Sequence, residues 1–458
     1  MTAGALTAPE DPAPTPQRTT YGRLARLTAA FHAPTLLAMA FVFGAQEGAG
    51  QGYSTAIDDI KKSFHVTDFT VSLVSPGMKA SGIIGGLLMG VLSDRMRRGR
   101  LLMWLMVLWT VATAGNALVP TFAVFYAARL FVAFAESPDA PVASLVGDYF
   151  AVEERGKRYS QLQIGATIGA ILGLFLTSAL VDAFGWRAWP LAWAPFGVVC
   201  IVLTMRMPEP ARGRRDAAFD ETRLGDVHDA EQAGEHVSGL AGVGLWEAAK
   251  RVLAVPTWKW TVVGLTCATM FEGALQTFGV SLYKRTFHLS SEKATLYLSA
   301  GGAGALIGVL GGGFLADRLL ARGIVRARVW VTAAGWLAAP AALIPALAIA
   351  KLPVTIPLFF VASFCFGLPA APMQALLVDV MVPELRGRAA AVRNIADAIT
   401  ATGTVLVGGV STAIGSLRVA FIALIPLFVV GGLCTVRAAR TYTEDIAFVV
   451  GHARRTSQ

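Results

Sequence analysis

Charged residues are scarce in this chain. Asp, Glu, Lys and Arg make up 15% of its 458 residues, against about 25% in soluble globular proteins. Hydrophobic residues make up 55%, and the mean hydropathy is +0.57. This balance favours a membrane protein. The net charge of +9 does not indicate a nucleic-acid partner, because the basic residues lie between apolar runs.

Cysteine and catalytic motifs are scarce too. The four cysteines have no CxxC spacing, and each lies inside an apolar run, which argues against a disulfide framework or a zinc site. The chain has no nucleophile elbow and no Gly-x-x-x-x-Gly-Lys-[Ser/Thr] loop, so an ATP-driven cycle is excluded. We therefore expect no enzyme, no cofactor and no bound metal.

Twelve apolar runs are long enough to cross a bilayer, which takes about 20 residues. They are 33–57, 69–92, 101–119, 121–146, 160–182, 187–206, 259–283, 294–316, 327–349, 354–380, 389–413 and 417–437. Barrel strands would instead alternate over about ten residues. We predict an all-α membrane protein with twelve transmembrane helices in two six-helix bundles, 31–206 and 259–437.

The connections set the expected orientation. Those after runs 2, 4, 8 and 10 are rich in Arg and Lys, whereas the one between runs 3 and 4 has neither. The positive-inside rule then places both termini in the cytoplasm, in a plasma (inner) membrane. Residues 1–30 lack a signal-peptide core and are expected to form a disordered tail. We predict a linker at 207–258, with an interfacial helix at 245–253, and a cytoplasmic tail at 438–458.

The two halves repeat each other. The block from Gly90 to Arg95 (GVLSDR) recurs 223 positions later as the block from Gly313 to Arg318 (GFLADR). Phe64-His65 recurs at the same offset as Phe287-His288. At an offset of 231, Pro138, Pro141, Asp148, Glu153 and Arg155 match Pro369, Pro372, Asp379, Glu384 and Arg386. The chain is thus predicted to be a duplicated, pseudo-symmetric pair of bundles, an architecture that transporters use for rocking motions.

The duplicated GxLxDR block resembles the signature of the major facilitator superfamily, and the resemblance covers about 33–440. Within it the chain most resembles the spinster family, through RLFVAFAE at 129–136, VDVMVPELR at 378–386 and GSLRVA at 415–420. That resemblance implies a proton-coupled transporter that moves a lysolipid or related amphiphile across the membrane by alternating access, and we expect it to act as a monomer. A multidrug exporter, an organic-anion uptake system and a non-transporting lipid receptor remain as alternatives.

Ionisable residues inside a span are costly and often functional. Arg129 and Glu136 stand seven residues apart, about two helical turns, so both should project from one face of helix 4. Their equivalents in the second half are Phe360 and Gly367, so the symmetry of the fold does not require the pair. We predict that Glu136 takes up the coupling proton and that Arg129 tunes it. A static ion pair is the alternative.

Glu47, Glu272 and Lys79 complete the predicted substrate cavity. The resemblance implies that helices 1, 4, 7 and 10 line it, which includes Glu47 and Glu272. The spinster pattern has an Asp-Arg pair on helix 1 where this chain has Gln46-Glu47. Lys79 is expected to neutralise one of the carboxylates, with Glu47 as one possible partner, or to contact an anionic headgroup.

The superfamily resemblance also places an inner, cytoplasmic gate at Asp94 and Arg95. Asp94 can interact with a helix N-terminus. Arg95 is expected to bridge to Asp148 or Glu153, with Arg155 beside them. Pro138 and Pro369 should bend helices 4 and 10 near their middles.

Overall fold

The computed structural model describes residues 18–150, 152–210, 245–382 and 385–456. Its first half holds α1 (Arg18–Gly50), α2 (Gly52–Phe64), α3 (Asp68–Ser72), α4 (Val74–Arg95), α5 (Arg98–Gly115), α6 (Phe122–Ala135), α7 (Asp139–Tyr149), α8 (Val152–Phe184) and α9 (Ala188–Met205). The pairs α1–α2, α3–α4 and α6–α7 each form one interrupted span, so this half has six spans.

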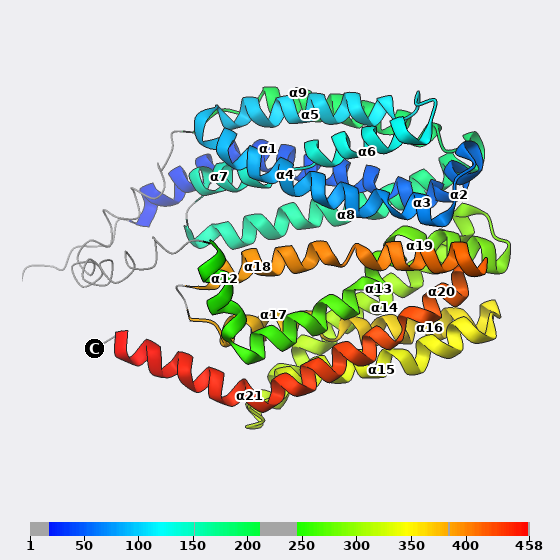
Figure 1. Ribbon diagram of the computed structural model, residues 1–458. Helices are drawn as coiled ribbons and strands as arrows, with labels where there is room; N and C mark the ends of the chain where they lie inside the picture. The colour runs from blue at the N-terminus through cyan, green and yellow to red at the C-terminus, as the bar shows by residue number, and fades with distance from the viewer. Residues whose placement is uncertain (1–17, 151, 211–244, 383–384, 457–458) are drawn as a thin grey trace, which may run out of the picture.

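The second half has the same order. It holds α12 (Leu245–Ala254), α13 (Pro256–Phe287), α14 (Ser291–Ala321), α15 (Ala327–Ile349), α16 (Leu352–Gly367), α17 (Ala370–Asp379), α18 (Arg386–Ile399), α19 (Thr402–Ile414), α20 (Leu417–Leu424) and α21 (Pro426–Thr456). The pairs α16–α17, α18–α19 and α20–α21 are again interrupted spans. The helices of the two halves lie side by side as two bundles (Figure 1), which confirms the predicted twelve-helix fold.

Eight helical stretches among the described residues are long and apolar enough to cross a membrane. Helix 4 fails that test because it is broken in the middle. Its first part, α6, ends at Ala135, and α7 begins after Pro138. Helix 10 also breaks, with α16 ending at Gly367 and Pro369 preceding α17, but its gap is shorter and it still counts among the eight stretches as Leu352–Asp379. The predicted proline breaks are confirmed.

The duplication is visible in the backbone. His65 ends α2 and His288 ends α13, and both adopt left-handed φ angles, 53° and 54°. Each is followed by a side chain that caps the next helix, Thr67 before α3 and Ser290 before α14. The repeat at 223 residues therefore preserves local conformation as well as sequence.

Both chain ends are more helical than the sequence suggested. The expected tail at 1–30 gives way to α1 from Arg18 onward, and the expected tail at 438–458 lies mostly within α21. The C-terminal part of α21 packs against other helices of the second half. Tyr442 is buried and donates to Asp379, and Asp445 accepts from the backbone N–H of Thr257 at 3.0 Å. These contacts explain why a polar segment continues the helix. The predicted helix at 245–253 is confirmed as α12, with Val252 buried.

Glycine allows α1 and α8 to pack backbone against backbone. A Cβ on Gly169 would lie 2.0 Å from the Gly44 carbonyl oxygen, and one on Gly173 would lie 2.2 Å from that of Gly48. Small residues at four-residue spacing are the usual means of close helix contact in membranes. The first half therefore depends on a seam where no side chain fits.

Replacing Gly169 with Ala tests this seam. We expect the free energy of unfolding to fall by about 1–3 kcal/mol, because the added methyl group forces two backbones apart. Unfolding in detergent can be followed by circular dichroism. Gly86→Ala is the matched control, because a Cβ there meets nothing within 4 Å. Equal stability of the two variants would contradict the packing argument.

The halves meet at one end of the molecule. We call it the α2–α3 end; it lies at the right of Figure 1, opposite α7, α12 and α18. Hydrogen bonds that join the halves between described residues gather there. Ser75 Oγ lies 3.0 Å from Thr277 Oγ1, and Ser178 Oγ lies 2.6 Å from Thr295 Oγ1. Asp182 accepts from the backbone N–H groups of Ser291 and Glu292 at the start of α14.

Candidate functional site

Arg129 is a buried cation without an acidic partner in direct contact among the described residues. Its side chain, on α6, is 3% exposed. The guanidinium lies 5.7 Å from the ring centre of Tyr53 and 5.4 Å from that of Trp189, and it contacts Met78 Sδ at 3.3 Å. Its Nε has no hydrogen-bond partner. Aromatic faces attract cations, so this pocket holds the charge while leaving donor capacity unused.

Glu136 lies at the break in helix 4. It is the first residue after α6, and its Oε1 accepts from the indole N–H of Trp109 at 3.1 Å. The carbonyl oxygen of the preceding residue, Ala135, accepts a hydrogen bond from the side-chain amide Nε2 of Gln46 at 3.4 Å. The Glu136 N–H still donates to the carbonyl of Val132 at 2.9 Å, so the helical pattern ends directly after this residue.

The structure thus brings Arg129 and Glu136 into one electrostatic environment, as predicted, but not into an ion pair. A static salt bridge was the alternative, and the described residues do not form it. Sequence reasoning missed Tyr53, Trp109 and Trp189, which surround the pair. Aromatic residues in apolar runs carry no signal of this role until the helices are packed.

Two further carboxylates lie close to Glu136. Glu47 on α1 interacts electrostatically with both Glu136 and Asp139, and Asp139 stands in the first turn of α7. The side chains of Glu47 and Asp139 are exposed. The predicted location of Glu47 beside the pair is therefore matched, and helices 1 and 4 together present three acidic groups.

Lys79 lies near enough to Glu272 to act on it electrostatically, but the two side chains do not form an ion pair, and no such influence of Lys79 on Glu47 is found. Lys79 is exposed on α4, in the first half, and Glu272 lies on α13, in the second. Asp397 on α18 acts on the same carboxylate, and Gln276 lies 3.5 Å from Glu272 Oε1. Asp397 also pairs with Arg393 at 3.7 Å. A charged cluster therefore spans the two halves.

A small apolar pocket adjoins Glu272. It lies inside the second half, among α13, α15, α16 and α21. Its lining is aromatic and aliphatic apart from Glu272 and Ser363: Phe271, Leu275, Ala339, Leu343, Phe359, Ala362, Phe366 and Phe428. A carboxylate at the edge of an apolar pocket suits a ligand with one polar and one apolar end.

Two of the predicted gate residues, Asp148 and Arg155, have other partners in this structure. Asp148 does not use Arg95; it forms an ion pair with Arg98, which is 1% exposed at the start of α5. Arg98 also donates to Ser144 Oγ at 2.7 Å and to Glu209 at 3.1 Å. The reason is position: Arg98 begins the helix that packs against α7, whereas Arg95 is exposed at the end of α4.

Of the other predicted gate residues, the structure describes the side chain of Arg155 but not those of Asp94 and Glu153. Arg155 donates to the carbonyl oxygens of Gly147 at 2.7 Å and Phe150 at 3.4 Å. These bonds satisfy carbonyls at the end of α7. Arg155 therefore stabilises a helix end.

The Arg98–Asp148 pair is duplicated. In the second half Arg328, at the start of α15, pairs with Asp379, the last residue of α17. The contact lies within each half, so it fixes the shape of a bundle. Glu209 supports the first copy: burial alone would raise its pKa, but hydrogen bonds from the N–H groups of Gly99 and Arg98 and from the Arg98 guanidinium hold that pKa below its usual range.

The described residues contain no cluster of three or more His, Cys, Asp or Glu side chains that could hold a metal ion.

The chain was compared with known families and structures. The family model described as "Major Facilitator Superfamily" matches residues 35–398. Protein spinster homolog 1 of Bos taurus is 24% identical over 355 residues, covering 73% of this chain and 64% of that protein. Protein spinster homolog 3 of Danio rerio is 27% identical over 222 residues, covering 47% and 41%. The matches thus span less than two thirds of these relatives' own length.

A solved structure has the same fold. It is that of a bacterial homologue of the human lysosomal transporter spinster, in an inward-facing and occupied conformation. The TM-score is 0.75 at 18% identity, and the match covers 90% of this chain and 97% of that one. The predicted family resemblance is confirmed.

Proposed function

Because this chain belongs to the major facilitator superfamily, we propose that it is a proton-coupled secondary transporter that moves a lysolipid or related amphiphile by alternating access. The observation that carries the proposal is Glu136 at the break in helix 4, close to a buried Arg129 that has no direct acidic partner among the described residues. A buried charge without a partner is costly in a membrane. A polar substrate headgroup or a proton exchange at Glu136 would compensate it.

The amphiphile is favoured by what surrounds the charges. Lys79 and Glu272 offer opposite charges for a zwitterionic headgroup, and the side chains packed beside Glu272 are aromatic and aliphatic. The substrate class is taken from the resemblance to the spinster family, which the relatives named spinster homolog support.

The positive-inside pattern completes the proposal. It assigns the α2–α3 end to the outside and both termini to the cytoplasm of a cell with this protein in its plasma (inner) membrane. The structure would then be open inward, because the halves are joined at the α2–α3 end. Both halves of the proposed transport path come from one chain, so the proposed cycle needs no second copy, and we propose that the protein acts as a monomer.

Flux into proteoliposomes tests the proposal. Vesicles with an imposed pH gradient receive a labelled lysophosphatidylcholine, citrate or a cationic dye in separate assays. We expect gradient-driven flux of the lysolipid above protein-free vesicles. Flux of the dye alone would favour a multidrug exporter, and flux of citrate alone an organic-anion carrier. Lysolipid binding without any flux would favour a receptor.

Lys79 and Glu272 should act as a coupled pair. We expect Lys79→Gln to slow flux because Glu272 loses its compensating charge, and we expect adding Glu272→Gln to recover part of the loss. A double-mutant cycle on flux rates should give a coupling of about 0.5 kcal/mol or more. Lys62→Gln, exposed at the α2–α3 end, is the control. Strictly additive effects would show that the two charges act separately.

A further inference from the structure

The sequence repeat places two basic pairs at the α2–α3 end. Lys61-Lys62 in the first half recurs 223 positions later as Lys284-Arg285. Lys61 pairs with Asp68, and Lys284 Nζ donates to Ser291 Oγ at 2.7 Å. Ser291 is the repeat equivalent of Asp68. The same local contact therefore exists twice, but only the first half has a carboxylate in it.

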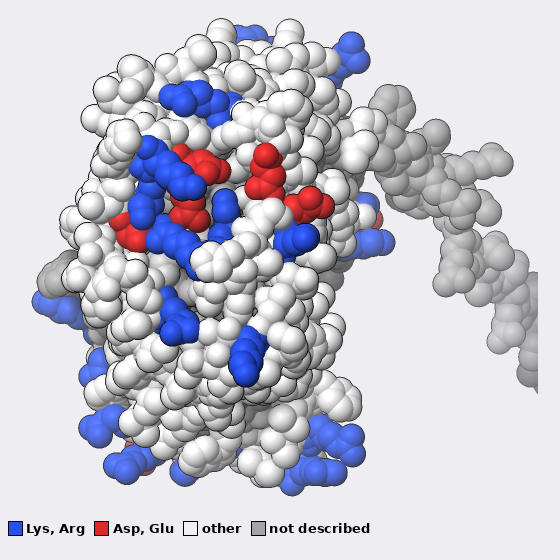
Figure 2. All heavy atoms as spheres, turned by 90° about the vertical axis from the view of Figure 1, so that its right-hand side faces the viewer, with Lys and Arg blue, Asp and Glu red and all other residues white. Residues whose placement is uncertain are grey.

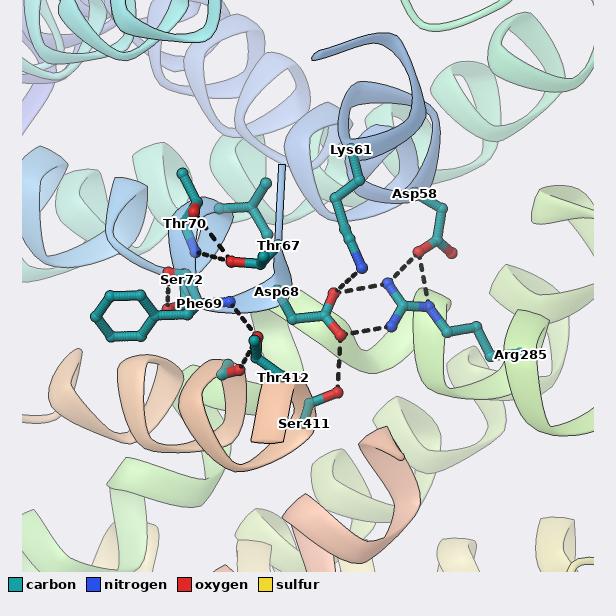
Figure 3. A network of polar contacts seen from close by, with 12 residues as sticks. Asp58, Lys61, Thr67, Asp68, Phe69, Thr70, Ser72, Arg285, Ser411 and Thr412 are labelled. Carbon is teal, nitrogen blue, oxygen red and sulfur yellow. Dashed lines mark hydrogen bonds and ion pairs between the residues drawn. The ribbon is translucent and has the colours of Figure 1, made fainter. Parts of the chain in front are cut away.

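That single carboxylate reaches across to the second half. Arg285 Nη1 donates to Asp68 Oδ2 at 2.8 Å and Nη2 donates to Oδ1 at 2.9 Å, a two-pronged pair (Figure 3). Ser411 on α19 adds a bond to Oδ2 at 2.7 Å. Asp58 on α2 also pairs with Arg285. We call Asp58, Lys61, Asp68, Arg285 and Ser411 the Asp68 cluster.

The cluster is partly shielded from water. Asp68 is 6% exposed and Arg285 is 31% exposed. Beneath it α3 packs directly on α19: Phe69 N–H donates to Thr412 Oγ1 at 2.9 Å, and a Cβ on Gly408 would lie 2.5 Å from Ser72. Charge-assisted, two-pronged bonds are the strong ones. This contact is therefore a substantial part of what joins the halves.

On the outer face, acidic and basic side chains lie intermingled around a hollow (Figure 2). Asp58, Lys61, Lys62, Val66, Lys284, Arg285, His288 and Leu289 line it. The cations outnumber the acids there, so the cluster's basic groups compete for Asp58 and Asp68.

We propose that Arg285 is a latch that holds the α2–α3 end closed, and that Lys61 is the partner that retains Asp68 when the latch opens. When the halves separate, Asp68 loses Arg285 and Ser411, which belong to the second half. It keeps Lys61, which lies in its own half. A carboxylate left with one cation costs far less than one left with none. Lys61 thereby lowers the free energy of the open state.

This inference rests on the alternating-access part of the proposed function, but its test needs no substrate. Spin labels are attached at Lys62→Cys and Lys293→Cys, exposed positions on opposite halves at this end, with the four native cysteines replaced by alanine. Pulsed electron paramagnetic resonance on protein in lipid nanodiscs then gives the distribution of distances between them.

Arg285→Gln should raise the ratio of long to short distances about tenfold, equivalent to about 1.4 kcal/mol. Lys61→Gln alone should lower the ratio, because the closed state keeps Arg285 on Asp68, whereas the open state is then left with no cation on that carboxylate. Lys284→Gln is the matched control, because its Ser291 contact stays within the second half, and it should leave the distribution unchanged.

Opposite effects at Arg285 and Lys61 cannot come from general loss of folding. An unchanged distribution in Arg285→Gln would overturn the latch. An unchanged or increased ratio in Lys61→Gln would overturn the role of Lys61. Either result with intact lysolipid flux would reject this inference alone, whereas opening without any flux would reject the proposed function.

Discussion

Glu136→Gln should abolish the response of transport to a pH gradient while leaving downhill movement of the lysolipid. Glutamine keeps the size of the side chain and can still face the Trp109 N–H, but it cannot take up a proton. One pH unit supplies about 1.4 kcal/mol per proton, a tenfold accumulation, and the variant should lose that accumulation entirely. The measurement is lysolipid uptake into proteoliposomes with and without the gradient.

Glu154→Gln is the control for this experiment. Glu154 is exposed and pairs with Arg158 one helical turn away, so its loss removes a carboxylate without touching the cavity. We expect its gradient-driven uptake to match that of the unmodified protein. Full accumulation by Glu136→Gln would show that the coupling proton binds elsewhere, with Glu47 or Asp139 as the next groups to test.

Arg98→Ala should be strongly destabilising. Its removal leaves Asp148, 8% exposed, without the guanidinium that pairs with it. Removing one partner of a buried ion pair typically costs about 3–5 kcal/mol. Glu209 loses the same cation. We expect a corresponding loss in the free energy of unfolding, measured by denaturant titration of the purified protein in detergent.

Arg100→Ala provides the comparison. Arg100 stands two residues later on α5 and is exposed, so its truncation should change stability by less than about 0.5 kcal/mol. Similar stabilities for the two variants would contradict a structural role for Arg98. A large loss of flux in Arg98→Ala with unchanged stability would restore a gating role to this end of the molecule.

The interrupted helices and the helical chain ends differ in how well neighbouring residues in the sequence predicted them. Pro138 and Pro369 remove backbone donors, and the breaks expected from them in helices 4 and 10 are present. Pro340 and Pro345 lie inside the continuous helix α15, so a proline in the sequence does not by itself decide whether a helix breaks. The helical chain ends were not predicted. Residues beyond 437 are polar enough to read as a tail, and α21 continues because Tyr442 and Asp445 find partners on other helices.

In the candidate site, too, spacing along the chain predicted neighbours within one span better than neighbours on different spans. Spacing placed Arg129 and Glu136 together because both lie on one span. Pairing across spans was harder: Lys79 had two possible carboxylates, and only the packing of α4 beside the second half favoured Glu272. Arg95 was expected to bridge to Asp148 because it belongs to the repeated block. Position along a loop does not reveal which cation enters the packed interface, and Asp148 pairs with Arg98.

The sequence by itself determined that the chain crosses a membrane, that it is duplicated, and that one half has ionisable residues which the other lacks. Those properties depend on composition, periodicity and local steric rules, which act within a few turns of chain. Only the tertiary structure decided that Arg98 takes Asp148 and that Arg285 takes Asp68, 217 positions away. Such pairs are chosen by where packed helices bring charges together, and the desolvation cost that selects one partner exists only after packing.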